Sequence, residues 1–353
     1  MQSDFHYYAT AVLARAAGFG EDQALTIAYA AQYVDDARDG RDILVGGREF
    51  SPLSTANDFG RYLASKDRDV WLKVYLPFHF LPPGPIASEA DDFITRPLGR
   101  LAERLIQDVA READADPDYR LVRLGVALHT IADTWAHQGF SGRWSRENDV
   151  TELESLGAPT NLREAMAEAW RDFTGPIHAA NPMQVAHFQA EFWPDYPFLA
   201  WRAHFAAPGA AGREHRRDNP REFLAAARWL HQTMSDWPKP PDRSVMSWDE
   251  LAPMVTARLA VSDPDREARC RPWRTAFAHL FPAHGGLPQY DPHAWEVAAL
   301  GEKLKQTPFS DAAEALGSRP SYPGRTGFVD SLWVKFHRAA AAQRAWLARQ
   351  VRF

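Results

Sequence analysis

Residues 124–142 contain the sequence feature that most constrains the fold. His129, Asp133 and His137 recur at every fourth position in a segment whose other residues are mainly apolar. This spacing places the three side chains on one face of a helix, and the apolar neighbours indicate that the helix is buried. Burying three such groups without partners is costly. A metal ion is the simplest partner that satisfies all three.

The same spacing indicates more than one ion. In an α-helix His129 and His137 lie about 12 Å apart along the axis, and each lies about 6 Å from Asp133. One ion cannot easily serve both histidines, whereas a carboxylate between them can bridge two ions about 3.5–4 Å apart. The alternative is a buried His–Asp–His hydrogen-bonded ladder without metal, in which Asp133 keeps the histidines charged.

Composition narrows the possible chemistry. The chain of 353 residues has one cysteine, Cys270, so neither a disulfide framework nor a cysteine zinc cluster is available. Metal ligands would be His, Asp and Glu, and Cys270 is expected to be a surface thiol. A net charge of -6 gives no polybasic signature for long nucleic acids. No apolar run is long enough to span a membrane and no signal peptide is visible, which predicts a soluble, cytoplasmic protein.

Helical periodicity dominates and period-two alternation is nearly absent, which predicts an all-α protein. The residues 38–60 and 194–220 are expected to be loops, and 71–83 a short strand or a buried extended segment. The Pro-rich stretch 237–243 divides a metal-binding helical domain, 1–236, from a C-terminal helical extension, 237–353, packed on the same core, with a single domain as the alternative. A central helix, which contains the stripe, is predicted to be capped by residues within 114–119. Further helices are predicted at 4–18, 21–37, 88–114 and 161–173, from 181, and at 220–235, 247–260, 264–280, 292–305 and 328–350.

Two helix ends are predicted to meet near the stripe. His6 falls in the first turn of the first helix, and Asp35 and Asp36 fall in the last turn of the second. An antiparallel pair with a short loop places these ends side by side. Two carboxylates at a helix C-terminus oppose the helix dipole unless a cation is near, so this local conflict indicates a site.

Further candidates lie in aromatic surroundings. His79 stands between two phenylalanines, and a satisfied core histidine is its alternative interpretation. His187 and Glu191 would lie one turn apart on the helix that begins at Asn181 and Pro182. The candidate metal ligands are therefore His6, Asp35, Asp36, His79, His129, Asp133, His137, His187 and Glu191.

In this order the candidates resemble the ligand pattern of the zinc-dependent phospholipase C and single-strand-specific nuclease superfamily. The best-matching motifs are HisThrIleAlaAsp, 129–133, and HisPheGlnAlaGlu, 187–191. The resemblance covers roughly the first 195 residues and implies an all-helical orthogonal bundle with three zinc ions, in which Asp133 bridges two. PheHisTyrTyrAlaThr, GlnTyrValAspAsp and HisGlnGlyPheSerGly also resemble an uncharacterised bacterial family of the same general kind.

The chain departs from the superfamily in three places. Members begin with a Trp whose amine and carbonyl bind zinc, whereas this chain begins MetGlnSerAsp, so that Asp4 is the candidate substitute. Members carry the next His six residues after the bridging Asp, where this chain has Gly139; His137 comes four after. Members are exported, and no signal peptide is visible here.

These observations predict a metal-dependent hydrolase that acts on a phosphate ester or phosphodiester through a metal-bridging hydroxide. Two or three Zn²⁺ are the expected cofactors, with iron or manganese as alternatives, and the substrate is expected to be a small molecule. Asp35 or Asp36 would ligate one ion and orient the attacking water. A non-hydrolytic di-iron enzyme and a helical module with a purely structural polar core are the alternatives.

Overall fold

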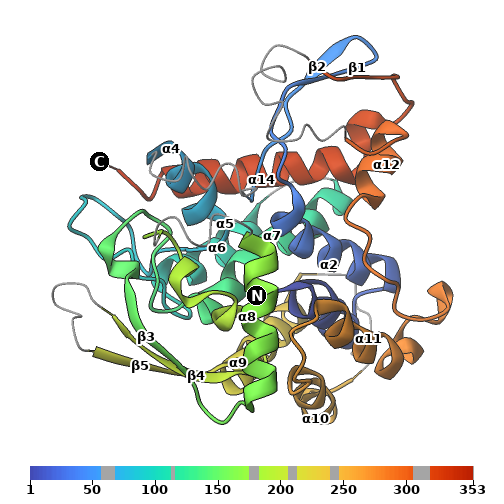
Figure 1. Cartoon of the computed structure of the whole chain (residues 1–353). Helices are drawn as coiled ribbons and strands as arrows, with labels where there is room; N and C mark the ends of the chain where they lie inside the picture. Colours follow the sequence, from blue (N-terminus) through green and yellow to red (C-terminus); the bar gives the residue numbers. More distant parts are fainter. Residues whose placement is uncertain are drawn as a thin grey trace.

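The computed structural model describes residues 1–56, 68–112, 116–174, 183–205, 213–238, 246–304 and 319–352. About 56% of the structure is helix and 10% is strand, in two small sheets. The fold therefore contains both helices and β-sheets, and the all-α prediction is wrong. Figure 1 shows the two sheets at opposite ends of a helical body, with the N-terminus near its middle.

Helix α7 (Pro117–Ala136) is the centre of the molecule. Asp116 caps it by accepting hydrogen bonds from the backbone amides of Asp118 and Tyr119, and Pro117 occupies its first turn. Every residue from Val122 to Ala136 is buried. The predicted cap and the predicted buried helix are both confirmed.

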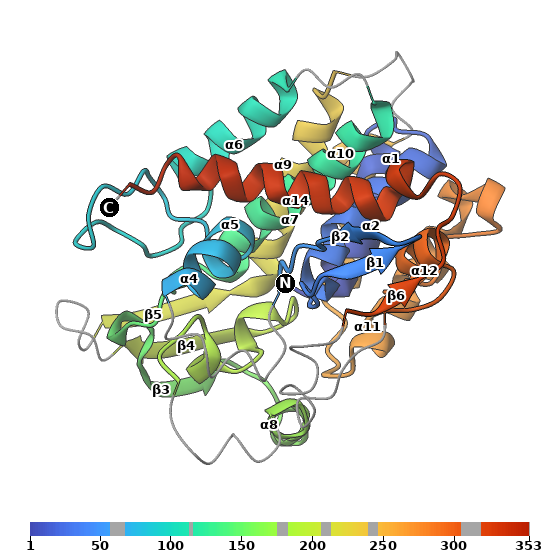
Figure 2. The same ribbon diagram turned by 90° about the horizontal axis from the view of Figure 1, so that it is seen from above.

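Other helices surround α7 on most sides. Helices α2 and α14 pack along it, α6 and α9 also contact it, and α14 crosses it in Figure 2. One hydrophobic core includes residues on both sides of the predicted 237–243 boundary, and residues 239–245 lie outside the described part of the chain. Among the described residues, the helices longer than one turn are α1 (Thr10–Ala16), α2 (Glu21–Asp36), α6 (Arg100–Arg111), α7, α8 (Thr160–Thr174), α9 (Asn219–Ser235), α10 (Trp248–Leu259), α11 (Arg266–Ala276), α12 (Ala294–Leu300) and α14 (Leu332–Ala348), with the π-helical segments η1 (Asp4–Ala9) and η3 (Trp71–Tyr75).

Helices α2 and α7 approach each other closely because of one glycine. A Cβ atom on Gly125 would lie 2.3 Å from the carbonyl oxygen of Ile27. No side chain fits in that space without moving backbone. The close crossing brings the C-terminal end of α2, which carries Asp35, beside α7.

Four of the six strands, β1, β2, β4 and β5, lie in the segments 38–60 and 194–220 that were expected to be loops. The first has the order β2–β1–β6, formed by β1 (Ile43–Val45), β2 (Arg48–Phe50) and β6 (Ser321–Tyr322). Gly46 and Gly47 both have positive φ, which suits the two-residue turn between β1 and β2. The second has the order β3–β4–β5, formed by β3 (Val150–Ser155), β4 (Ala200–Phe205) and β5 (Arg213–Asp218), all antiparallel. Burial alternates along β4, and this short period-two pattern was missed between aromatic and proline-rich segments.

Two further predictions near the stripe are wrong. Residues 71–78 are helical, as η3 followed by α5 (Leu76–Phe78), and His79 ends α5. Beyond residue 182 the chain forms two single 3₁₀ turns, Phe188–Ala190 and Trp193–Asp195, and not a helix. Prolines at 194 and 197 prevent a longer run. The cap predicted at 181 and 182 lies outside the described residues. Within the described ranges, no helix combines the length and apolar character required to span a bilayer.

Candidate metal centre

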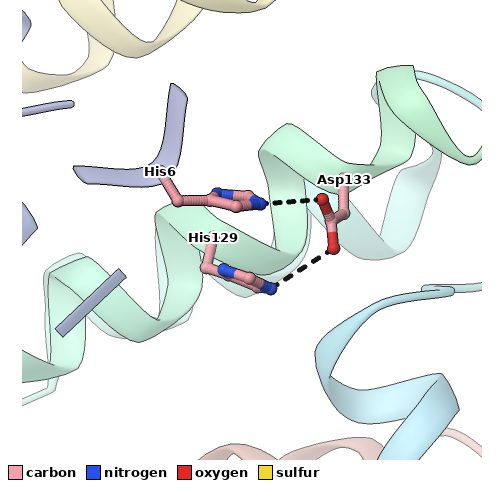
Figure 3. A group of neighbouring side chains, drawn as sticks. All are labelled: His6, His129 and Asp133. Carbon is pink, nitrogen blue, oxygen red and sulfur yellow. Dashed lines mark hydrogen bonds and ion pairs between the residues drawn. The ribbon is translucent and has the colours of Figure 1, made fainter. Parts of the chain in front are cut away.

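The carboxylate of Asp133 is the centre of a buried cluster. Its Oδ1 lies 3.0 Å from Nε2 of His6, and its Oδ2 lies 3.3 Å from Nε2 of His129. The two imidazole rings stack at 3.9 Å and both point toward Asp133 (Figure 3). All three residues are 1% exposed or less. His6 comes from η1, a π-helical turn of the kind that often marks functional sites.

The amino group of Met1 joins this cluster. It lies 2.7 Å from Oδ1 of Asp133 and 2.9 Å from Oδ1 of Asp195. Burial disfavours the charged amine, but the carboxylates of Asp133 and Asp195 outweigh burial and raise the pKa of this group to about 11. The amine therefore carries a proton at neutral pH in the absence of a competing cation.

A second group adjoins the first through His129. Nδ1 of His79 and Nε2 of His129 are 3.2 Å apart, and each lies 3.7 Å from Oδ1 of Asp35. Nδ1 of His79 is also 3.3 Å from Oδ2 of Asp133. The side chain of Asp35 is 27% exposed, the largest value in the centre. Asp35 therefore marks the side that opens to solvent.

A third group consists of His137, His187 and Asp195. Oδ1 of Asp195 lies 3.1 Å from Nε2 of His137, and its Oδ2 lies 3.4 Å from Nε2 of His187. His137 is the C-cap residue of α7, and Asp195 ends the second 3₁₀ turn. In each of the three groups, candidate ligand atoms lie within 4.8 Å of one another, the spacing at which they could hold an ion.

Backbone carbonyls fix the orientation of three of the imidazole rings. His79 donates from Nε2 to Thr55 at 2.9 Å, His137 from Nδ1 to His79 at 2.8 Å, and His187 from Nδ1 to Glu191 at 2.8 Å. Each bond places a proton on the outer nitrogen and turns the inner nitrogen toward the carboxylates. Histidines that bind metals commonly have such an outer hydrogen bond. The three rings are therefore held in an orientation that is compatible with metal binding.

The electrostatic balance of the centre also favours cations. Three carboxylates (Asp35, Asp133 and Asp195) face one ammonium group, and no arginine or lysine of the described ranges forms an ion pair with them. Burial lowers the pKa of His187 to about 4, and burial with the neighbouring His129 holds the pKa of His6 well below its usual range. Both rings are thus neutral at pH 7. The carboxylates outnumber the ammonium group, and Nδ1 of both His6 and His129 is buried without a hydrogen-bond partner. The donor set fits divalent ions.

Three predicted candidates lie outside the centre. The carboxylate of Asp36 accepts hydrogen bonds from the Tyr290 hydroxyl at 2.8 Å and from Gln32 at 3.0 Å. Glu191 contributes only its backbone carbonyl, and Asp4 forms an ion pair with Arg269 at 2.7 Å. Asp35, and not Asp36, is the member of the doublet that faces the histidines.

Two members of the centre were not among the predicted ligands, Asp195 and the Met1 amine. Asp195 follows His187 by eight residues, but the chain between them forms two separate 3₁₀ turns, so helical spacing does not bring the two side chains together. The sequence feature that could have identified Asp195 is its position as a single acidic residue within the aromatic segment PheTrpProAspTyrProPhe, 192–198. Such a residue is costly to bury without a partner.

Cys270 is buried, so the prediction of a surface thiol is wrong. Its sulfur lies 3.6 Å from the Ser3 hydroxyl. Burial raises the pKa of the thiol to about 12, which keeps it protonated at neutral pH. Cys270 is therefore a packing residue between α11 and the N-terminal turn.

Comparison with known proteins gives a family but no activity. No curated protein and no solved structure matches the chain. A family model described as a family of unknown function, DUF6765, matches residues 1–351. This match includes every residue of the centre described above, and the chain therefore belongs to the DUF6765 family.

Proposed function

We propose that the chain is a metal-dependent hydrolase of phosphate esters or phosphodiesters that holds two or three divalent ions. The observation that carries this proposal is the set of three adjacent groups of ligand atoms, each within 4.8 Å, arranged around Asp133. The first comprises His6, His129 and Asp133, the second Asp35, His79 and His129, and the third His137, His187 and Asp195. Adjacent ions that share a carboxylate suit displacement at phosphorus.

The donor set favours zinc over iron. Five imidazoles and three aspartates meet in the three groups, without a glutamate or a cysteine. Imidazole-rich sets suit zinc, whereas helical di-iron sites are built mainly from glutamates with Glu-x-x-His motifs. The sequence resemblance to zinc-dependent phospholipase C and single-strand-specific nucleases agrees with this assignment. The ligand order from His6 to His187 follows that resemblance, and Asp195 takes the place expected for Glu191.

Divalent ions at such a centre supply Lewis-acid polarisation of the phosphoryl group and lower the pKa of water. The roles proposed for the residues of the centre follow from how exposed each side chain is. Asp35 lies at the open side, where it can accept a hydrogen bond from the attacking water and orient it. Asp133 and Asp195 are buried and keep the histidines in place. A net charge of -6 favours a small phosphodiester over a long nucleic acid.

Metal analysis is the first test. We expect two to three zinc ions per chain after purification without chelator. Iron in stoichiometric amount would support the di-iron alternative, and protein without bound metal that takes up none from added zinc would contradict the proposal.

The second test is activity on an aryl phosphodiester. Hydrolysis should stop after treatment with chelator and return when zinc is added. Asp35→Asn should reduce the rate at least 100-fold, and the neighbouring Asp36→Asn, a matched control, should change it less than a few-fold. A rate that is insensitive to chelator, or an equal loss in both variants, would contradict the assigned chemistry.

A further inference from the structure

Arg269 of α11 is a buried arginine that contacts the N-terminal turn. Its Nε donates to Oδ2 of Asp4 at 2.7 Å, and its Nη2 donates to the side-chain oxygen of Gln2. Its Nη1 donates to the carbonyl oxygens of Asp263 at 2.6 Å and Pro264 at 3.0 Å. The guanidinium thus holds two residues of the N-terminal segment and is itself held by the loop before α11.

The same guanidinium reaches the segment that carries Asp195. It lies over the ring of Tyr196, 5.3 Å from the centroid, and Tyr196 directly follows Asp195. Arg269 therefore contacts both chain segments that meet at the centre. The Met1 amine, one residue before Gln2, lies 2.9 Å from Asp195.

We propose that Arg269 is a positioning residue that holds the N-terminal turn so that the Met1 amine and the His6 ring face Asp133. This inference rests on the proposed function only in taking the amine and His6 as part of a metal-binding group. Arginine suits the role because its planar fork donates in several fixed directions, which an ammonium group cannot do. Buried ion pairs contribute little net stability, and in some proteins they specify conformation instead.

The position of the amine can be measured without metal. Chelator-treated protein is exposed to an amine-acylating reagent, and modification of Met1 is followed by peptide mass spectrometry, with the 54% exposed side chain of Lys73 as internal reference. We expect Arg269→Met to accelerate modification of Met1 at least ten-fold relative to Lys73. Arg269→Lys, which keeps the charge and is expected to fold more readily, should give an intermediate rate.

Arg123→Met is the matched control. Arg123 is also buried and paired, with Nε 3.0 Å from Oε2 of Glu112 and Nη1 2.9 Å from Gln343, but it contacts neither the N-terminal turn nor Asp195. The Arg123→Met variant should have a lower melting temperature than wild type, as Arg269→Met should. Its rate of Met1 modification should equal that of wild type. Wild-type rates in both Arg269 variants, or an equal acceleration in Arg123→Met, would overturn the proposal.

Metal content separates this inference from the proposed function. Arg269→Met should bind one ion fewer per chain than wild type, and Arg123→Met should bind the full number. If wild type binds no ion but Arg269→Met still accelerates modification of Met1, the proposed function fails and the positioning role stands. If wild type binds ions and Arg269→Met retains them all at the wild-type rate of modification, the positioning role fails and the proposed function stands.

Discussion

The candidate centre has two halves that are built in different ways. The helical half comprises His6, Asp35, His79, His129 and Asp133, which lie on η1, α2 and α7 and at the end of α5. The irregular half comprises His137, His187 and Asp195, which lie at the end of α7 and in 3₁₀ turns. Helix geometry fixes the first half, and tertiary hydrogen bonds fix the second.

The backbone conformation also distinguishes the irregular half from the helical half. In the irregular half, Ala186 and Glu191 flank His187 and its 3₁₀ turn, and both have φ of 55°. Such conformations cost about 1–3 kcal/mol for residues other than glycine and persist where the surroundings enforce them. Asn219 supplies part of that constraint, because its Nδ2 donates to the carbonyls of Trp193 at 2.7 Å and Tyr196 at 2.8 Å. The irregular half therefore depends on distant residues.

The largest expected effect is in the helical half, at Asp133→Asn. The substitution preserves shape but removes the charge that faces the Met1 amine and four histidines. The amine and the histidines lose the carboxylate that they all face, so the free energy of unfolding of the metal-free protein should fall by about 3–5 kcal/mol even though the amine keeps Asp195 at 2.9 Å. Metal content should fall by more than one ion per chain. Unchanged metal content and unchanged denaturant midpoint would refute the central role of Asp133.

Asp195→Asn tests whether the irregular half binds an ion of its own, independently of the helical half. We expect loss of one ion per chain and a destabilisation of about 1–3 kcal/mol, because the Met1 amine keeps Asp133 as a partner. Glu191→Gln is the matched control, since Glu191 provides a backbone carbonyl to the site, and metal content should not change. The reverse result, loss of metal only in Glu191→Gln, would restore Glu191 as the ligand.

A buried histidine outside both halves gives a reference for pH dependence. His337 on α14 accepts a hydrogen bond from the Leu53 amide at 3.0 Å, and burial lowers its pKa to about 3. The unfolded chain binds a proton there below about pH 6.5 and the folded chain does not, so stability falls as pH decreases from 6.5 toward 3. The contribution is about 1.4 kcal/mol per pH unit within that window.

His337→Gln retains an acceptor for Leu53 but does not titrate. Urea unfolding of chelator-treated protein between pH 4.5 and 6 should therefore show a shallower slope in the variant than in wild type. The difference isolates His337 from the histidines of the two halves. Parallel slopes would show that His337 is protonated in the folded state.

The smallest effect is expected at Asp36→Asn. An asparagine oxygen can still accept from the Tyr290 hydroxyl, so the loss of stability should stay below about 1.5 kcal/mol. Metal content should remain at the wild-type value. Loss of an ion would place Asp36 in the helical half in place of Asp35, and metal analysis of both single variants decides between them.

Sequence reasoning succeeded where local periodicity determines position. The buried α7 with its Asp116 cap, and the proximity of His6 to the end of α2, follow from helical spacing and short loops. The choice between Asp35 and Asp36 could not be made, because adjacent residues differ by only about 100° around a helix. Tyr290, 254 residues away from Asp36, makes that distinction.

The positions of the residues in the irregular half also could not be predicted, and the reason is different. Asp195 reaches the centre through 3₁₀ turns between prolines and through Asn219, and none of these contacts has a repeat in the sequence. The sheets were missed because their strands are two to six residues long. β5, with the sequence ArgGluHisArgArgAsp, has no apolar face.

The hydrogen bond from Nδ1 of His137 to the carbonyl of His79 connects two ligand groups through a single peptide unit. A shift of His79 on occupation of its group would move the acceptor that orients His137 in the other. If the two groups bind ions as proposed, such a shift would couple their occupation, and by reciprocity each ion would change the affinity for the other by the same factor. We expect zinc titrations to show the two groups filling together over a narrow concentration range, as a paired cofactor rather than as independent ions.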